Sequence, residues 1–211
     1  MMRMRDSTTP QRRSAAVARA EKSGRIPRAT LTVLLVTGAF TVWQFLHPHL
    51  LDQLRRDPDL VTNGEWWRSF TPLLVQDPPW QAVATVTGIV ILGVNVERFY
   101  GGAGMLAVYL GSGLAGEAIG YALQPHGAGN SVADCGMIGA LAVYLLSEEG
   151  SKVLPVRLPR GVRRTLAAVV GVGACAAVYA ATSATRDIHG PAALAGAAIG
   201  ALLLGRRRRR S

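Results

Sequence analysis

The side chains best suited to nucleophilic chemistry are a cysteine and a histidine in separate apolar segments. Cys135 lies in a short apolar segment, and His189 begins the last one. A thiol activated by an imidazole is a workable nucleophile, because a cationic partner favours the thiolate. Asp134 opposes this, because a neighbouring carboxylate disfavours a second negative charge. Cys135 is therefore either half of a nucleophilic pair or a small packed thiol.

A hydroxyl is available one helical turn away. Ser131 follows Gly129 and Asn130 at the edge of a loop, a pattern typical of the start of a helix, so a capping role is the simpler interpretation. His189 likewise has a simpler interpretation, as a buried residue that forms hydrogen bonds and takes no part in catalysis. Asp187 precedes it by two positions, where its carboxylate either accepts a loop amide or tunes the imidazole.

The sequence predicts no metal site and no cofactor. The chain has two cysteines, too few for a site built from thiolates alone. His47, His49 and His126 stand in loops without the spacing of metal ligands.

Composition places these residues in a membrane protein. The 211 residues are 49% hydrophobic and 17% charged, whereas a soluble domain carries about a quarter charged residues. The basic residues gather in two clusters, at residues 1–28 and 206–210, and long apolar segments lie between them. A soluble nucleic-acid-binding domain would spread them over a folded face, so this class is excluded.

Six apolar segments have the length, or nearly the length, of a membrane span. They occupy residues 29–46, 80–97, 104–123, 132–146, 164–182 and 189–204. The sequence thus predicts an all-α domain over residues 29–204, a basic tail at 1–28 and a polybasic tail at 205–211. The fourth segment is shorter than the roughly 20 residues of an unaided span, so it is expected to be tilted or to face a water-filled cavity.

The distribution of Lys and Arg predicts the orientation of the spans. One side of the six-span topology holds 19 of the 23 basic residues and the other side holds 4. The positive-inside rule then places both termini in the cytoplasm and the protein in the cell membrane, as a multi-pass protein. The basic tails are expected to bind anionic lipid headgroups. We expect this membrane to be a bacterial inner membrane, and the preference for Arg over Lys with abundant Ala, Gly and Val is typical of a GC-rich genome.

Small and charged residues inside the spans predict how the helices pack. Gly196 and Gly200 are four residues apart, which lets two helices approach closely. Glu97, beside Arg98, ends the second span and is expected to anchor it, and Glu117 is expected to pair with a polar group across the bundle. The segment at 47–79 holds Trp and Phe residues and is expected to lie in the membrane interface.

These features, in this order, resemble the rhomboid family of intramembrane serine proteases. The resemblance rests on the Trp-Trp-Arg stretch at residues 64–72, on Gly-Val-Asn-Val-Glu at 93–97, on the turn at 133–136, and on His189 with its two glycines. It covers roughly residues 29–204 and implies a six-helix rhomboid-like bundle.

The resemblance also implies site residues. The family uses a serine in a Gly-x-Ser-Gly turn and a histidine as its base, which places Cys135 at the serine position with Gly136 retained and His189 as the base. A second alignment uses Ser131. The family's oxyanion pattern of two histidines and an asparagine falls on Gln76, Gln81 and Thr85.

Two functions follow from this comparison. With the nucleophile and its oxyanion donors substituted together, the favoured prediction is a catalytically impaired rhomboid-like protein, a pseudoprotease that binds transmembrane segments of client proteins. The alternative is an active intramembrane protease, a peptidase that acts through Cys135, or Ser131, with His189. Neither function involves nucleic acid.

Overall fold

The computed structural model describes residues 26–150, 159, 162 and 187–209. Within them the chain is helical, and strand pairing is limited to one bridge between Arg56 and Gly127. The long helices are α2 (Arg28–Leu46), α7 (Gly102–Leu123), α8 (Ser131–Leu146) and α10 (His189–Arg208). The shorter elements are α3 (His49–Leu54), α4 (Pro58–Thr62), η1 (Trp66–Ser69), η2 (Thr71–Leu74), α5 (Gln81–Gly88), η3 (Ile89–Gly93) and α6 (Val94–Tyr100).

The second span is one continuous helix with a wider turn in its middle. The turn η3 has π-helical hydrogen bonding and joins α5 to α6, so residues 81–100 form a single rod of 20 residues. This rod begins one residue later and ends three residues later than the apolar pattern predicts.

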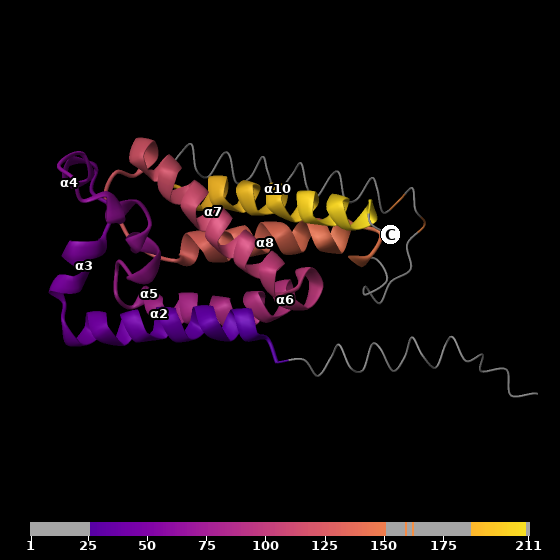
Figure 1. Cartoon of the computed structure of the whole chain (residues 1–211), viewed down its shortest axis with the longest axis horizontal. Coiled ribbons are helices and arrows are strands. Elements are labelled where there is room, and N and C mark those ends of the chain that lie inside the picture. The colour runs from indigo at the N-terminus through magenta and orange to yellow at the C-terminus, as the bar shows by residue number, and fades with distance from the viewer. Residues whose placement is uncertain (1–25, 151–158, 160–161, 163–186, 210–211) are drawn as a thin grey trace, which may run out of the picture.

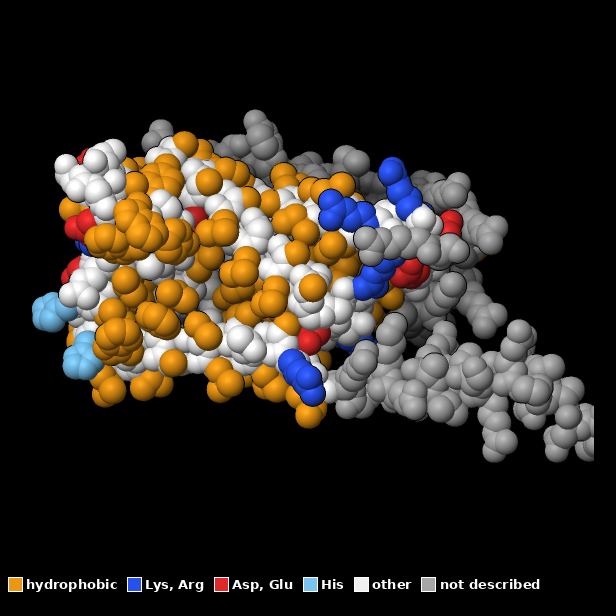
Figure 2. Space-filling view, in the orientation of Figure 1, with side chains coloured by type: hydrophobic (Ala, Val, Ile, Leu, Met, Phe, Trp, Pro, Cys, Tyr) orange, Lys and Arg blue, Asp and Glu red, His pale blue; other side chains and the backbone are white. Residues whose placement is uncertain are grey.

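Among the described residues, three helices are long and apolar enough to cross a membrane: Arg28–Leu46, Gln81–Tyr100 and Gly102–Leu123. The shorter apolar helix Ser131–Leu146 and the 20-residue helix His189–Arg208 match two more predicted spans. The predicted span at 164–182 lies outside the described residues. Apolar side chains cover much of the middle of the bundle in Figure 2, as expected of a surface that faces lipid.

Helices α8 and α10 lie side by side along the long axis of the molecule, and α7 packs against both (Figure 1). Glycine makes this contact possible. A Cβ added at Gly196 would lie 2.0 Å from the carbonyl oxygen of Gly136, and one added at Gly139 would lie 2.0 Å from that of Ala193. The two backbones therefore touch directly.

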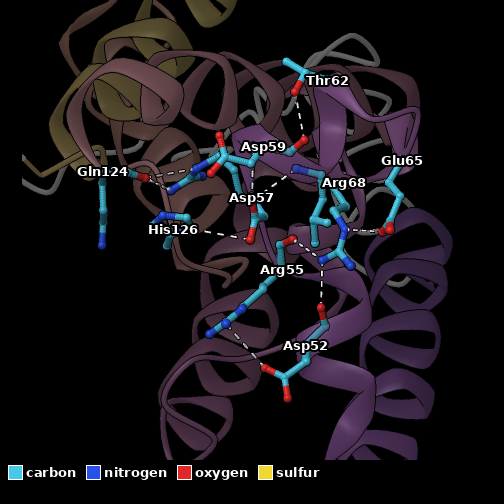
Figure 3. A network of polar contacts seen from close by, with 11 residues as sticks. Asp52, Arg55, Asp57, Asp59, Thr62, Glu65, Arg68, Gln124 and His126 are labelled. Carbon is cyan, nitrogen blue, oxygen red and sulfur yellow. Dashed lines mark hydrogen bonds and ion pairs between the residues drawn. The ribbon is translucent and has the colours of Figure 1, made fainter.

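The segment between the first two spans folds into the short elements α3, α4, η1 and η2 (Figure 1). Trp66 and Phe70 are exposed, as an interfacial segment requires. Arg68 is buried and holds the segment together: Nη1 donates to the carbonyls of Asp52 at 2.7 Å and Arg55 at 3.0 Å, and Nε donates to Glu65 at 2.6 Å (Figure 3).

Arg56 is a buried residue, whereas charge counting treats it as an ordinary loop cation. Its side chain is 1% exposed and forms an ion pair with Glu117 of α7, which is equally buried. Nε and Nη2 donate to the carbonyl of Gln124 at 3.1 and 2.6 Å, and the backbone N–H donates to Gly127 at 2.9 Å. Arg56 thus ties the first long loop to the loop that leads into α8.

At the end of the bundle opposite Arg56, two further side chains, Glu97 and Arg207, connect neighbouring helices through hydrogen bonds. Glu97 accepts hydrogen bonds from the backbone N–H groups of Ala29 and Thr30 at 3.1 and 2.7 Å, which satisfies the first turn of α2. Arg207 donates to the carbonyls of Phe99 at 2.8 Å and Tyr100 at 2.5 Å. Helix α10 therefore continues into the predicted polybasic tail, and Arg207 in that tail binds protein.

Candidate active site

The structure brings Ser131 and His189 into direct contact. Ser131 is the first residue of α8 and His189 the first residue of α10, and Ser131 Oγ lies 2.8 Å from His189 Nε2. The two residues are 58 positions apart in the chain. Because both helices start at the same end of the bundle and pack along each other, their first residues meet there.

The other ring nitrogen of His189 is also occupied. Asp187 Oδ1 lies 2.5 Å from Nδ1 and accepts the backbone N–H of His189 at 3.3 Å. Burial favours protonated Asp187, but the hydrogen bonds and the charge of His189 outweigh it and lower the pKa of Asp187 below its ordinary value.

The backbone before Ser131 is fixed by a network of buried polar groups. Gly129 has φ +145°, which glycine adopts without strain, and its N–H donates to the carbonyl of Pro72 at 2.9 Å. Asn130 is fully buried: its Oδ1 accepts from Gln76 Nε2 at 3.0 Å, and its Nδ2 donates to Tyr109 at 3.1 Å. These contacts set where α8 begins and hence where Ser131 points.

The residues predicted at the oxyanion positions, Gln76, Gln81 and Thr85, lie together near the turn that precedes Ser131. Gln76 is held by reciprocal hydrogen bonds with Gln44, at 2.7 and 2.8 Å, and its Oε1 accepts from Thr85 Oγ1 at 3.4 Å. Gln81 lies close by: a Cβ built on Gly129 would be 3.8 Å from Oε1 of both Gln76 and Gln81, and 3.4 Å from Ser131 Oγ.

Cys135 does not take part in these contacts. It lies one turn further into α8 and is a free, half-buried thiol. Both nitrogens of His189 already have partners, and among the hydrogen bonds of the described residues none uses the Cys135 sulfur. The alignment that pairs Cys135 with His189 is thus not the arrangement found, and the arrangement found is the Ser131 alternative.

The capping role expected of Ser131 is also absent. Asn130 is the N-cap residue of α8, and its side chain makes no capping hydrogen bond. Ser131 follows it and directs its hydroxyl to His189. Sequence reasoning missed Asn130, Tyr109 and Gln44 as members of the site. The one available signal was the polar Gly-Asn-Ser run at the head of an apolar helix.

No metal site is found in the part of the chain that the structure describes, since it holds no group of three or more His, Cys, Asp or Glu residues. The arrangement at Ser131 instead combines a hydroxyl, an imidazole and a carboxylate in one row, which is the arrangement of nucleophilic acyl transfer.

A sequence model of the Rhomboid domain matches residues 63–210, well over half of the chain. The chain belongs to the rhomboid family. It is 32% identical over 93 residues to "Rhomboid protease GluP" of Bacillus subtilis (strain 168), covering 44% of this chain and 18% of that protein. It is 34% identical over 85 residues to "Putative rhomboid protease YdcA" of the same organism, covering 40% of this chain and 43% of that protein.

The matches therefore cover less than half the length of either curated relative. Family membership and the apolar helices make this chain a rhomboid-type membrane protein of an intramembrane protease-like class.

Proposed function

We propose that this rhomboid protein is an active intramembrane serine endopeptidase, with Ser131 as nucleophile and His189 as general base. The observation that carries the proposal is the 2.8 Å contact between Ser131 Oγ and His189 Nε2 at the paired starts of α8 and α10. The names of the two relatives, "Rhomboid protease GluP" and "Putative rhomboid protease YdcA", support the same class of reaction. Its substrates are membrane-spanning segments of other proteins.

The reaction proceeds in two steps. Ser131 gives its proton to His189 Nε2 while Oγ bonds to the scissile carbonyl carbon. The carbon–nitrogen bond breaks, and the amine leaves with the proton that His189 carries. Water then attacks the acyl-serine, gives a proton to His189 and releases the carboxylic acid, and that proton returns to Ser131 Oγ.

A donor for the developing oxyanion is present at the nucleophile. Ser131 is in the first turn of α8, where a helix offers its N–H groups no partner, and the described hydrogen bonds leave its N–H unused. Gln81 lies beside the same turn with its Oε1 towards Gly129, and rotation of the amide group would present Nε2 there as a second donor. The substituted oxyanion pattern therefore retains donor groups.

The second candidate function is binding of client transmembrane segments without cleavage. It is favoured by the state of Gln76 and Asn130, whose amides are bonded to neighbouring side chains and not directed at Ser131 Oγ. On this hypothesis the site is a buried polar network that retains the family's shape.

The proposed location is the cytoplasmic membrane of a bacterium, with both termini in the cytoplasm. The 19-to-4 distribution of basic residues supports this orientation. Exposed Arg206 and Arg208, at the end of the bundle away from Ser131, support contact with anionic lipid headgroups on that side.

The test is a cleavage assay in liposomes with a panel of single-span reporter proteins. Wild type is compared with Ser131→Ala, His189→Ala and Cys135→Ala. We expect the first two variants to lose cleavage and Cys135→Ala, the matched control in the same helix, to retain it. Cleavage that requires Cys135 would overturn the assignment of Ser131. Reporter segments that crosslink to folded wild type without being cut would support the binding function.

A further inference from the structure

Asp187 makes contacts that a two-residue mechanism does not require. It precedes α10, and its carboxylate is held by two groups of the same residue, the Nδ1 and the backbone N–H of His189. The side chains of Asp187 and His189 are 39% and 35% exposed, so the pair lies at the mouth of the site and not in its core.

The chemistry of the pair fixes the proton on the imidazole. An ionised carboxylate only accepts hydrogen bonds, so the ring nitrogen that faces Asp187 carries a hydrogen. In a neutral imidazole the other nitrogen, Nε2, is then the acceptor, and it is the atom that faces Ser131 Oγ. The Asp187 contact therefore selects the tautomer that a general base needs.

The segment that carries Asp187 is held against the nucleophile by apolar packing. Ile188, between Asp187 and His189, is 3% exposed and forms a small cluster with Val132 and Ala192. Val132 is the residue after Ser131. The same cluster thus fixes both Ser131 and the Asp187 to His189 segment, which gives the three polar groups a common support.

We propose that Asp187 is a positioning residue that holds His189 in the Nδ1–H tautomer and stabilises the imidazolium formed during catalysis. The inference rests on the proposed function and adds a third group to the Ser131 and His189 pair. The lowered pKa of Asp187 agrees with it, because a group that remains ionised can serve as this acceptor.

The kinetic test uses a fluorophosphonate probe on the full chain in liposomes, because no substrate needs to be known. Ser131 Oγ bonds to phosphorus, fluoride leaves, and the hydroxyl proton passes to His189. We expect labelling to disappear in Ser131→Ala and His189→Ala. We expect Asp187→Ala to slow it about 10²-fold, less than the loss from a fully buried triad aspartate, because this pair is half-exposed. Asp187→Glu should restore part of the rate.

The matched control is Asp52→Ala. Asp52 is an exposed carboxylate near the same end of the bundle, and its partner is Arg55 at 3.6 Å and not an imidazole. Its removal should leave the labelling rate within twofold of wild type. Thermal unfolding in micelles checks that each variant is folded.

The second measurement reads the tautomer directly and needs no activity. The chain has four histidines, so His47→Gln, His49→Gln and His126→Gln leave His189 alone for ¹⁵N-histidine NMR. We expect the Nδ1–H form when Asp187 is present and a shift towards the Nε2–H form in Asp187→Ala.

The outcomes separate the two proposals. If wild type is not labelled at Ser131, the protease function fails, and the NMR spectra still decide whether Asp187 sets the ring. If labelling depends on Ser131 and His189 but Asp187→Ala stays within twofold of wild type, or if the tautomer does not change, the role of Asp187 is overturned and the protease function stands.

Discussion

Helix α8 contacts α10 and α5, two of its neighbours, in different ways. Against α10 the contact is backbone to backbone, with Gly196 seated on the carbonyl of Gly136. Against α5 the contact is backbone to side chain, because Gly88 faces the carboxyl group of Asp134. Ser131 and His189 are the first residues of the two helices at the α8–α10 interface. Gln81 and Thr85 belong to α5, the helix that packs on α8 at the second interface.

The difference shows which distances the fold keeps constant. Two backbones in direct contact have no side chain that can rotate to absorb a change, so the Ser131 to His189 distance is fixed by main chain. A carboxyl group can swing, so the position of α5 is adjustable. The Ser131–His189 pair is therefore rigidly placed, and α5, which forms one wall of the candidate site, is the part that can move.

The largest effect is expected at the α8–α10 interface. In Gly196→Ala the new methyl group would lie 2.0 Å from the oxygen and 2.6 Å from the Cα of Gly136. Because only backbone stands in the way, the helices must separate, and we expect a loss of about 3 kcal/mol or more. Thermal unfolding in micelles and the yield of monodisperse protein measure it. A stable, active Gly196→Ala protein would contradict the rigid interface.

A smaller effect is expected where α8 meets α7. In Gly136→Ala the methyl group would lie 1.7 Å from Ser112 Oγ and 2.2 Å from its Cβ. We expect a loss of about 1–3 kcal/mol, because one small buried side chain must move. The double variant Gly136→Ala with Ser112→Gly should recover most of the stability. Failure to recover would mean that the clash is not with Ser112.

The α5–α8 interface should tolerate the same change better. In Gly88→Ala the methyl group meets only the end of Asp134, at 2.4 Å from Oδ2. We expect a loss of about 1 kcal/mol or less, since the carboxyl group can rotate away. In a double-mutant cycle with Asp134→Ser the loss should vanish. A loss as large as that of Gly196→Ala would make the two interfaces equally rigid.

The smallest effect is expected at Gly205, which provides the control for the series. It lies in α10, and an added Cβ would have nothing within 4 Å. Gly205→Ala should stabilise the helix by about 0.5–1 kcal/mol, because alanine restricts the unfolded chain more than glycine. A destabilised Gly205→Ala protein would show that helix propensity does not govern this end of α10.

Much of this architecture follows from the sequence. Apolar length predicts the described spans, and the glycines at 196 and 200 predict a close helix contact. The exact start of α8 does not follow. Ser131 and Cys135 are one turn apart on one helix face, and choosing between them depends on Asn130 and Gly129, whose roles come from buried partners far along the chain. Pattern reasoning cannot see such partners.

The same limit applies to charge. In the sequence, Arg56 and Arg68 have the character of solvated loop cations, and the topology prediction counts both of them in this way. Their burial depends on carbonyl groups that only the folded loop presents. Asp187 was visible as a neighbour of His189, but which of its possible contacts it makes depends on the turn through Ile188.

The separation of Ser131 and His189 by 58 residues has a consequence for biosynthesis. When α8 leaves the ribosome, α10 has not been translated, so the nascent chain holds a serine without its base. On the proposed protease function, the Ser131–His189 pair is complete only when α10 has entered the membrane and its glycines have docked on α8. The same proposal then implies that neighbouring nascent membrane proteins are not cleaved until insertion is complete.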